Sequence, residues 1–151
     1  MSDLRDLYQE VIFDHNRHPR NFGKLEGYNR KAEGFNPLCG DKLVLYLKVN
    51  DRDVIEDVRF EGRGCAISTA SASLMTEALK GRPVAEAEAM FKGFHDLIMD
   101  EKVQDAGPEL GKLQVLEGVK AYPSRVKCAT LAWHTLEAAL EERDESVVST
   151  E

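Results

Sequence analysis

The chain has 151 residues, a length typical of one domain, and it carries a formal net charge of −7. Hydrophobic residues make up 42% and charged residues 31%, which is ordinary for a globular protein that forms its own core. The negative charge argues against nucleic acid as the main partner, because phosphate binding requires a basic surface. We therefore expect residues 1–151 to form a single domain with no nucleic-acid partner.

The first ten residues, MSDLRDLYQE, contain no apolar segment of the kind that signal peptides carry. No apolar run approaches the ~20 residues that a membrane-spanning helix needs. We therefore expect a cytoplasmic protein without a membrane partner, in which thiols stay reduced. Three cysteines cannot all pair with one another, so these thiols are expected to bind metal or to react.

The first expected element is an amphipathic helix over residues 3–16, because apolar side chains recur there at helical spacing. Residues 17–38 are rich in Gly and Pro and predict a loop, with a short edge strand near Arg30–Phe35. Apolar residues alternate over 43–49 and 54–60 on either side of a polar turn, so these segments predict an antiparallel hairpin.

The hydrophobic period changes to that of a helix at Ala66, and Gly81 ends this helix. Pro83 opens another helix. The remaining predicted segments are a loop over 99–107, a short helix over 108–116 and a last helix over 123–143. Strands that come early and helices that come late predict an α+β fold, with a small antiparallel β-sheet and helices packed on one face.

The three cysteines lie at two junctions between elements and in one helix. Cys39 and Asp41 share the turn before the first hairpin strand, so both side chains can reach one ion. Cys65 directly precedes a predicted helix, and a helix N-terminus favours the thiolate. Cys128 shares an apolar stripe of the last helix and is expected to face the core. Neither interval between the cysteines is a zinc-finger spacing, so spacing alone leaves three separate buried cysteines as an open alternative.

Three segments carry a resemblance to a known family: NPLCGD over 36–41, GRGCAISTASAS over 62–73 and RVKCA over 125–129. In this order, and over nearly the whole chain, the sequence resembles the U-type iron–sulfur cluster assembly proteins, which include IscU-like, NifU-like and SufU-like members. The resemblance implies the IscU-type (SufE/NifU-like) fold. It also implies one metal or cluster site, for which we expect zinc, with the ligands Cys39, Asp41, Cys65 and Cys128.

Three features near the last cysteine are similar to the SufU-like branch. Lys127 stands where IscU-like scaffolds carry a His, and residues 121–127 read AYPSRVK where those scaffolds carry a Leu-Pro-Pro-Val-Lys chaperone motif. The interval between Cys65 and Cys128 is also longer than the IscU pattern. The resemblance then implies a zinc-dependent sulfurtransferase that takes persulfide sulfur from a pyridoxal-phosphate-dependent, SufS-like cysteine desulfurase. It implies Cys39 as the acceptor, with a His of the desulfurase replacing Cys39 on zinc.

Two other functions stay open at this point. The same four residues can hold iron or a [2Fe–2S] cluster, which would make the chain a scaffold that meets other iron–sulfur assembly proteins. The site can also be a purely structural zinc site. Arg125 lies one helical turn before Cys128 and is a candidate catalytic residue that stabilises a thiolate or orients Asp41.

A basic segment over 17–31 is a candidate contact for an acidic partner, although ordinary solvated charge explains it equally well. His15 and His18 are candidate docking residues beside it. The small residues of the run 68–73 are expected to allow close packing of a helix, and Trp133 is expected to lie in the core.

Overall fold

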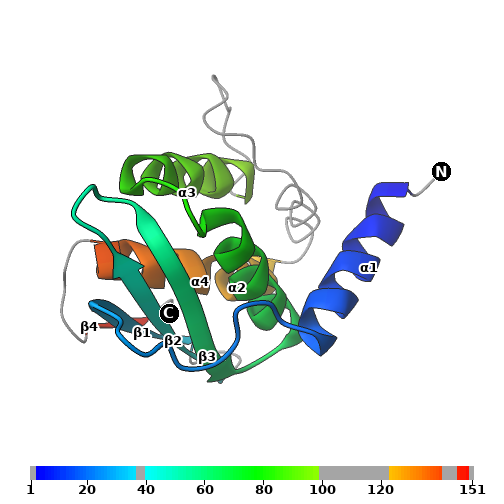
Figure 1. Ribbon diagram of the computed structural model, residues 1–151. Helices are drawn as coiled ribbons and strands as arrows, with labels where there is room; N and C mark the ends of the chain where they lie inside the picture. Colours follow the sequence, from blue (N-terminus) through cyan, green and yellow to red (C-terminus); the bar gives the residue numbers. More distant parts are fainter. Residues whose placement is uncertain (1–2, 37–39, 99–122, 141–145, 150–151) are drawn as a thin grey trace.

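The computed structural model describes residues 3–36, 40–98, 123–140 and 146–149. Its helices and strands form the α+β fold that the sequence predicts, with a sheet on one side and helices on the other (Figure 1). In chain order the elements are α1 (Asp3–Arg17), β1 (Arg30–Asn36), β2 (Asp41–Val49), β3 (Ile55–Arg63), α2 (Ala66–Leu79), α3 (Val84–Ile98), α4 (Pro123–Leu140) and β4 (Ser146–Ser149).

The predicted hairpin is present as β2 and β3, which pair antiparallel with Leu45 opposite Phe60. β1 pairs antiparallel with β2 on the other side. Inner-face residues of the three strands alternate with more exposed ones, and this alternation is what the period of two in the sequence indicates.

Two features of the sheet differ from the sequence prediction. The strand order is β3-β2-β1-β4, so β1 lies inside the sheet and the prediction of an edge strand near Arg30–Phe35 is wrong. β4, which the sequence analysis did not predict, pairs parallel with β1 and covers the edge that β1 would otherwise leave free. The predicted loop 99–107, the predicted helix 108–116 and the predicted end of the last helix at 141–143 lie outside the described residues.

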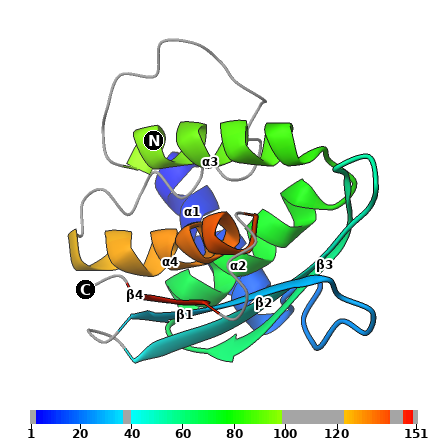
Figure 2. The same ribbon diagram turned by 90° about the vertical axis from the view of Figure 1, so that its left-hand side faces the viewer.

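The helices cover one face of the sheet, as Figure 2 shows. α4 packs on β1 and β2, α2 packs on β3 and on α4, and α3 packs on α4 from outside. α1 contacts α2 at the side of the molecule. Among the helices that the structure describes, none has both the length and the apolar character needed to cross a bilayer.

The small residues of α2 allow close packing, as predicted, and their hydroxyl groups also form hydrogen bonds. Ser71 is buried and its Oγ donates to the carbonyl oxygen of Ala129 on α4 at 2.6 Å. Trp133 is fully buried in the core between α4 and α3, and its ring stacks on Phe94 with centroids 4.8 Å apart.

His15 corrects a sequence prediction, because it is buried and does not belong to a docking surface. Its Nδ1 lies 2.7 Å from Oγ of Ser73, and the same hydroxyl accepts a hydrogen bond from the backbone N–H of Arg20 at 2.8 Å. This arrangement ties the end of α1 and the following chain to α2.

Candidate metal centre

The structure brings Asp41, Cys65 and Cys128 together at one end of the sheet. One ligand atom from each residue lies within 4.8 Å of the other two. Asp41 begins β2, and the pairing of Lys42 with Arg63 brings the end of β3, and therefore Cys65, beside it. Cys128 comes from α4, which packs over β1 and β2. Three segments that are distant in sequence thus meet at this point.

Cys65 is the N-cap of α2, as its position before Ala66 predicts. Its Sγ accepts a hydrogen bond from the backbone N–H of Ser68 at 3.4 Å. The side chain is half-buried, so a partner in solution can still approach it.

Asp41 is fully buried, and a buried carboxylate is costly unless polar groups surround it. Its Oδ1 accepts a hydrogen bond from the backbone N–H of Cys65 at 2.8 Å. Its Oδ2 lies 4.0 Å from Sγ of Cys65 and accepts a hydrogen bond from Nδ2 of Asn36 at 3.2 Å. Oδ2 therefore faces the sulfur atoms and is the oxygen available to a metal ion.

Asn36, the first residue of the NPLCGD motif, is a further residue of the site, for which the sequence predicted no role. It is fully buried at the end of β1, and its Nδ2 lies 3.5 Å from Sγ of Cys128 as well as beside Asp41. A side-chain amide can donate two hydrogen bonds, so Asn36 can serve both acceptors. In the sequence, the one feature that could have indicated a role for Asn36 is a polar residue at an inward-facing position of the strand β1.

Gly64 is the second residue that the sequence analysis missed. A Cβ atom added there would collide with Oδ1 of Asp41, so only glycine lets the chain pass this closely behind the carboxylate. Gly64 therefore holds space for the hydrogen bond between Asp41 and Cys65.

The three residues fit a thiolate-preferring metal ion. In a tetrahedral zinc site with Zn–S distances near 2.3 Å, neighbouring sulfur atoms lie roughly 3.8 Å apart. Separations of up to 4.8 Å need only small side-chain movements to reach that geometry. Two thiols and a carboxylate are a donor set for zinc or for an iron–sulfur cluster, not for Mg²⁺ or Ca²⁺.

Two of the predicted site residues are not tested by this geometry. Cys39 lies outside the described residues; the backbone N–H of Gly40 donates a hydrogen bond to the carbonyl oxygen of Asn36 at 2.9 Å. Arg125 is exposed on the first turn of α4, one turn before Cys128, and its catalytic role stays a prediction.

Comparison with known proteins agrees with this arrangement. The family model described as the NifU-like N terminal domain matches residues 7–129. The chain belongs to this family. The family assignment confirms the resemblance that the cysteine motifs carry.

Named relatives in the family have two kinds of description. The chain is 46% identical over 136 residues to the zinc-dependent sulfurtransferase SufU of Bacillus subtilis (strain 168), covering 90% of each chain. It is 41% identical over 140 residues to the iron–sulfur cluster assembly scaffold protein IscU of Streptococcus pyogenes serotype M1, covering 93% of this chain and 86% of that one.

Solved structures of the family share the fold. FiSufU of the SUF system from Fervidobacterium islandicum AW-1 superimposes with a TM-score of 0.82 at 39% identity, covering 90% of this chain and 98% of that one. The N-terminal part of a NifU-like protein from Brucella abortus gives a TM-score of 0.80 at 22% identity over 93% of this chain and 96% of that one, and it supports the fold alone. The predicted IscU-type α+β fold is confirmed.

Proposed function

We propose that this chain is a zinc-dependent sulfur acceptor in iron–sulfur cluster assembly, which takes persulfide sulfur from a pyridoxal-phosphate-dependent, SufS-like cysteine desulfurase. The observation that carries the proposal is the meeting of Asp41, Cys65 and Cys128, with Cys39 two residues before Asp41 in the chain. The name of the Bacillus subtilis relative supports the choice of zinc and of sulfur transfer.

The site supplies the conditions that persulfide transfer needs. Bound by Cys39, Asp41, Cys65 and Cys128, zinc would keep the thiols deprotonated at neutral pH. The thiolate of Cys39 attacks the terminal sulfur of the donor persulfide and forms a new S–S bond. The S–S bond of the donor breaks, and its electron pair leaves with the donor thiolate, so the exchange involves no net oxidation.

The surroundings of the three cysteines favour Cys39 as the acceptor. Cys65 is fixed as the N-cap of α2, and Cys128 is buried within α4, so neither can move far without disturbing a helix. In the sequence Cys39 stands between Pro37 and Gly40, two residue types that favour turns, and Gly40 has a φ of 71°, which only glycine adopts readily. Cys39 can therefore leave the metal at the smallest cost to the fold.

Mass spectrometry after incubation with desulfurase and cysteine tests this proposal. We expect one added sulfur atom on Cys39, and no added sulfur in a Cys39→Ser variant whose circular dichroism is unchanged. Exposed, non-ligand residues such as Lys42 offer a matched control, because Lys42→Ala should leave sulfur uptake intact. Sulfur found on Cys65 or Cys128, with Cys39 unmodified, would overturn the assignment.

The basic segment 17–31 is the proposed contact for the desulfurase, and the structure narrows the residues to test. Arg20 forms an ion pair with Asp14 at 2.8 Å, so reversing its charge would disturb the protein itself. Arg17 and Lys24 are exposed. Replacing these two by Glu should slow association and reduce its salt dependence, because peripheral charges act mainly on the association rate. Unchanged association kinetics across a salt series would remove this segment from the interface.

A scaffold for a [2Fe–2S] cluster is the second candidate, because the Streptococcus pyogenes relative carries that description and the same donor atoms suit iron. Metal analysis and visible absorption of protein purified without added metal separate the two functions. Stoichiometric zinc in a colourless protein that accepts sulfur supports sulfur transfer. A brown protein with two irons and two sulfides per chain supports the scaffold.

A further inference from the structure

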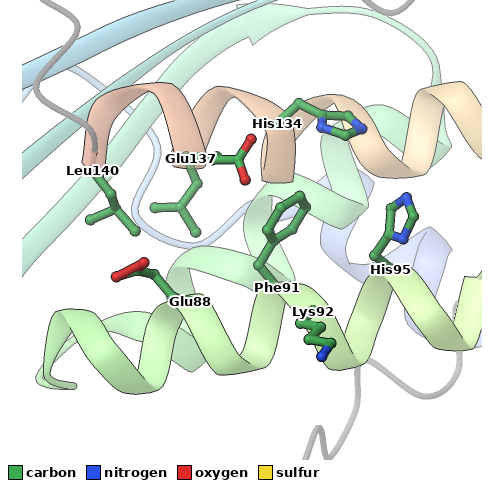
Figure 3. Close-up of a pocket in the computed structure, with 8 residues that line it drawn as sticks. Glu88, Phe91, Lys92, His95, His134, Glu137 and Leu140 are labelled. Atoms are coloured by element: carbon green, nitrogen blue, oxygen red, sulfur yellow. The ribbon is translucent and has the colours of Figure 1, made fainter. Parts of the chain in front are cut away.

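A cleft of about 440 Å³ lies between α3 and α4, on the side of α4 away from the sheet (Figure 3). Phe91, Leu136 and Leu140 supply apolar walls. His95 from α3 and His134 from α4 lie at one end of the cleft. None of these residues belongs to the candidate metal centre, and the proposed function makes no use of them.

The two imidazole rings approach each other from different helices, as Figure 3 shows. Their centroids are 6.2 Å apart. Phe91 contacts both rings, with its centroid 6.1 Å from that of His95 and 5.6 Å from that of His134. Within the part of the chain that the structure describes, no hydrogen bond is formed by either ring, although both are half-buried. Neither ring has a buried nitrogen without a partner among the described residues, so the ring nitrogens reach solvent and are available as ligand atoms.

Burial and a neighbouring ring favour the neutral form of His134. Burial lowers the pKa of His134, and the neighbouring His95 lowers it further, while Glu137 acts in the opposite direction. A neutral imidazole is the form that binds metal. Glu137 follows His134 by three residues on α4, and side chains at this spacing share one face of a helix.

We propose that His95 and His134, with Glu137 as a third ligand, form a second site for a divalent transition-metal ion of the zinc and nickel class. Two imidazoles and one carboxylate are a donor set that suits these ions. The charged residues that line the cleft are two acids, Glu88 and Glu137, and one base, Lys92, so the charge of its wall does not repel a cation. An ion bound here would link α3 to α4.

The site differs from the candidate metal centre in how far its ligands are assembled. In the described part of the chain, only the group of Asp41, Cys65 and Cys128 already has three ligand atoms within 4.8 Å of one another. An ion bound here therefore requires rotation toward His134 of Glu137, which is exposed, and of His95, which is half-buried. The histidine site is therefore weaker than the cysteine site and fills after it.

Trp133 provides a local reporter for this site. It is the only tryptophan of the chain, it precedes His134, and its ring stacks on Phe91 with centroids 6.4 Å apart. Ni²⁺ is paramagnetic and quenches the fluorescence of a nearby indole. We expect the zinc-loaded full-length chain to show saturable quenching by Ni²⁺ with one ion per chain.

Matched variants separate the proposed site from other surface ligands. His95→Gln and His134→Gln should each weaken the apparent Ni²⁺ affinity at least tenfold. His18→Gln removes an exposed histidine that does not line this cleft and should leave the titration unchanged. Glu137→Gln, at an exposed position that the fold tolerates, should weaken binding by a smaller factor and serves if the His134 variant fails to fold.

Two outcomes would overturn the proposal. One is quenching of equal affinity in the unaltered chain and in the His95→Gln and His134→Gln variants. The other is thiolate-to-nickel charge-transfer absorption that grows in parallel with the quenching, because it would place the ion at Cys65 and Cys128 instead.

Discussion

Nδ2 of Asn36 lies 3.2 Å from Oδ2 of Asp41, at the end of β1 beside the first residue of β2. The same nitrogen lies 3.5 Å from Sγ of Cys128. One neutral side chain thus neighbours two candidate metal ligands that would both be negatively charged. Hydrogen bonds to such ligands fix their orientation and lower the free-energy cost of burying their negative charge.

Replacing Asn36 by Ala should weaken metal binding without unfolding the chain. Partners of this kind are worth roughly 10–100-fold in metal affinity, and the buried carboxylate of Asp41 would lose one donor. Competition against a chromophoric chelator measures the affinity. Asn29→Ala is the matched control, because Asn29 also forms two hydrogen bonds, but with the backbone of Val49 away from the site. Equal affinity in the Asn36 variant and the unaltered chain would contradict the assigned role.

Replacing Gly64 by Ala should displace the carboxylate of Asp41, because the new Cβ would overlap its Oδ1. Gly64 does not have a positive φ, so backbone strain adds nothing to the effect. We expect a loss of about 1–3 kcal/mol in the free energy of unfolding and a weaker metal site. Urea unfolding of a double-mutant cycle with Asp41→Ala tests the cause, since the cost of Gly64→Ala should fall once the carboxylate is absent. Strictly additive costs would show that the contact is unimportant.

The sequence indicated most of the elements because their periodicity is local. The strands of the hairpin β2–β3 alternate every two residues, and helices such as α3 bury one face that repeats every 3.6 residues, whereas α2 and α4 are buried on most sides and are marked by their small and apolar residues. The position of β1 inside the sheet was not predictable in this way, because it depends on the partner β4. β4 has four residues, Ser146–Ser149, and its two valines form too short a pattern to distinguish a strand from a polar tail.

The candidate site was predictable to the extent that its ligands lie in recognisable local positions. Cys65 was expected at a helix start and is an N-cap, and Cys128 was expected to face inward and is buried. Asn36 contacts Asp41 and Cys128, and Gly64 makes room for Asp41, through strand pairing and a close backbone approach. Such contacts join residues of different segments and form only in the folded chain, so the spacing of residues in the sequence does not indicate them.

Replacing Ser73 by Ala should loosen the attachment of α1. The change removes the hydroxyl that lies beside Nδ1 of His15 and accepts from the backbone N–H of Arg20. Leaving these groups without that partner should cost about 1–3 kcal/mol in the free energy of unfolding. Hydrogen exchange should become faster in α1, while the metal affinity should stay unchanged.

Ser71→Ala is the control for the Ser73 variant, on the same helix. Ser71 donates to the carbonyl oxygen of Ala129, which lies inside α4 and keeps its helical hydrogen bond when the hydroxyl is removed. Ser71→Ala should therefore lower the free energy of unfolding by less than Ser73→Ala does, and it should not accelerate hydrogen exchange in α1. An equal acceleration of α1 exchange in both variants would contradict a specific link through His15.

The stability of the protein should fall on acidification in part because of His134, whose pKa is lowered in the fold by burial and then by His95. A histidine in the unfolded chain has a pKa of about 6.5. Above that pH the ring is neutral in both states, and the folded state carries no penalty. Below pH 6.5 the unfolded chain binds a proton that the folded chain does not bind, so the free energy of unfolding declines until the pH reaches the lowered pKa.

His134→Gln should therefore show a shallower loss of unfolding free energy between pH 7 and pH 5 in urea titrations. The charged or titratable groups that act on this ring are His95 from α3 and Glu137 from α4, while Glu88 and Lys92 of α3 line the same cleft, and His95→Gln should flatten the slope less than His134→Gln. An unchanged slope in the His134 variant would show that this ring does not contribute to the acid sensitivity.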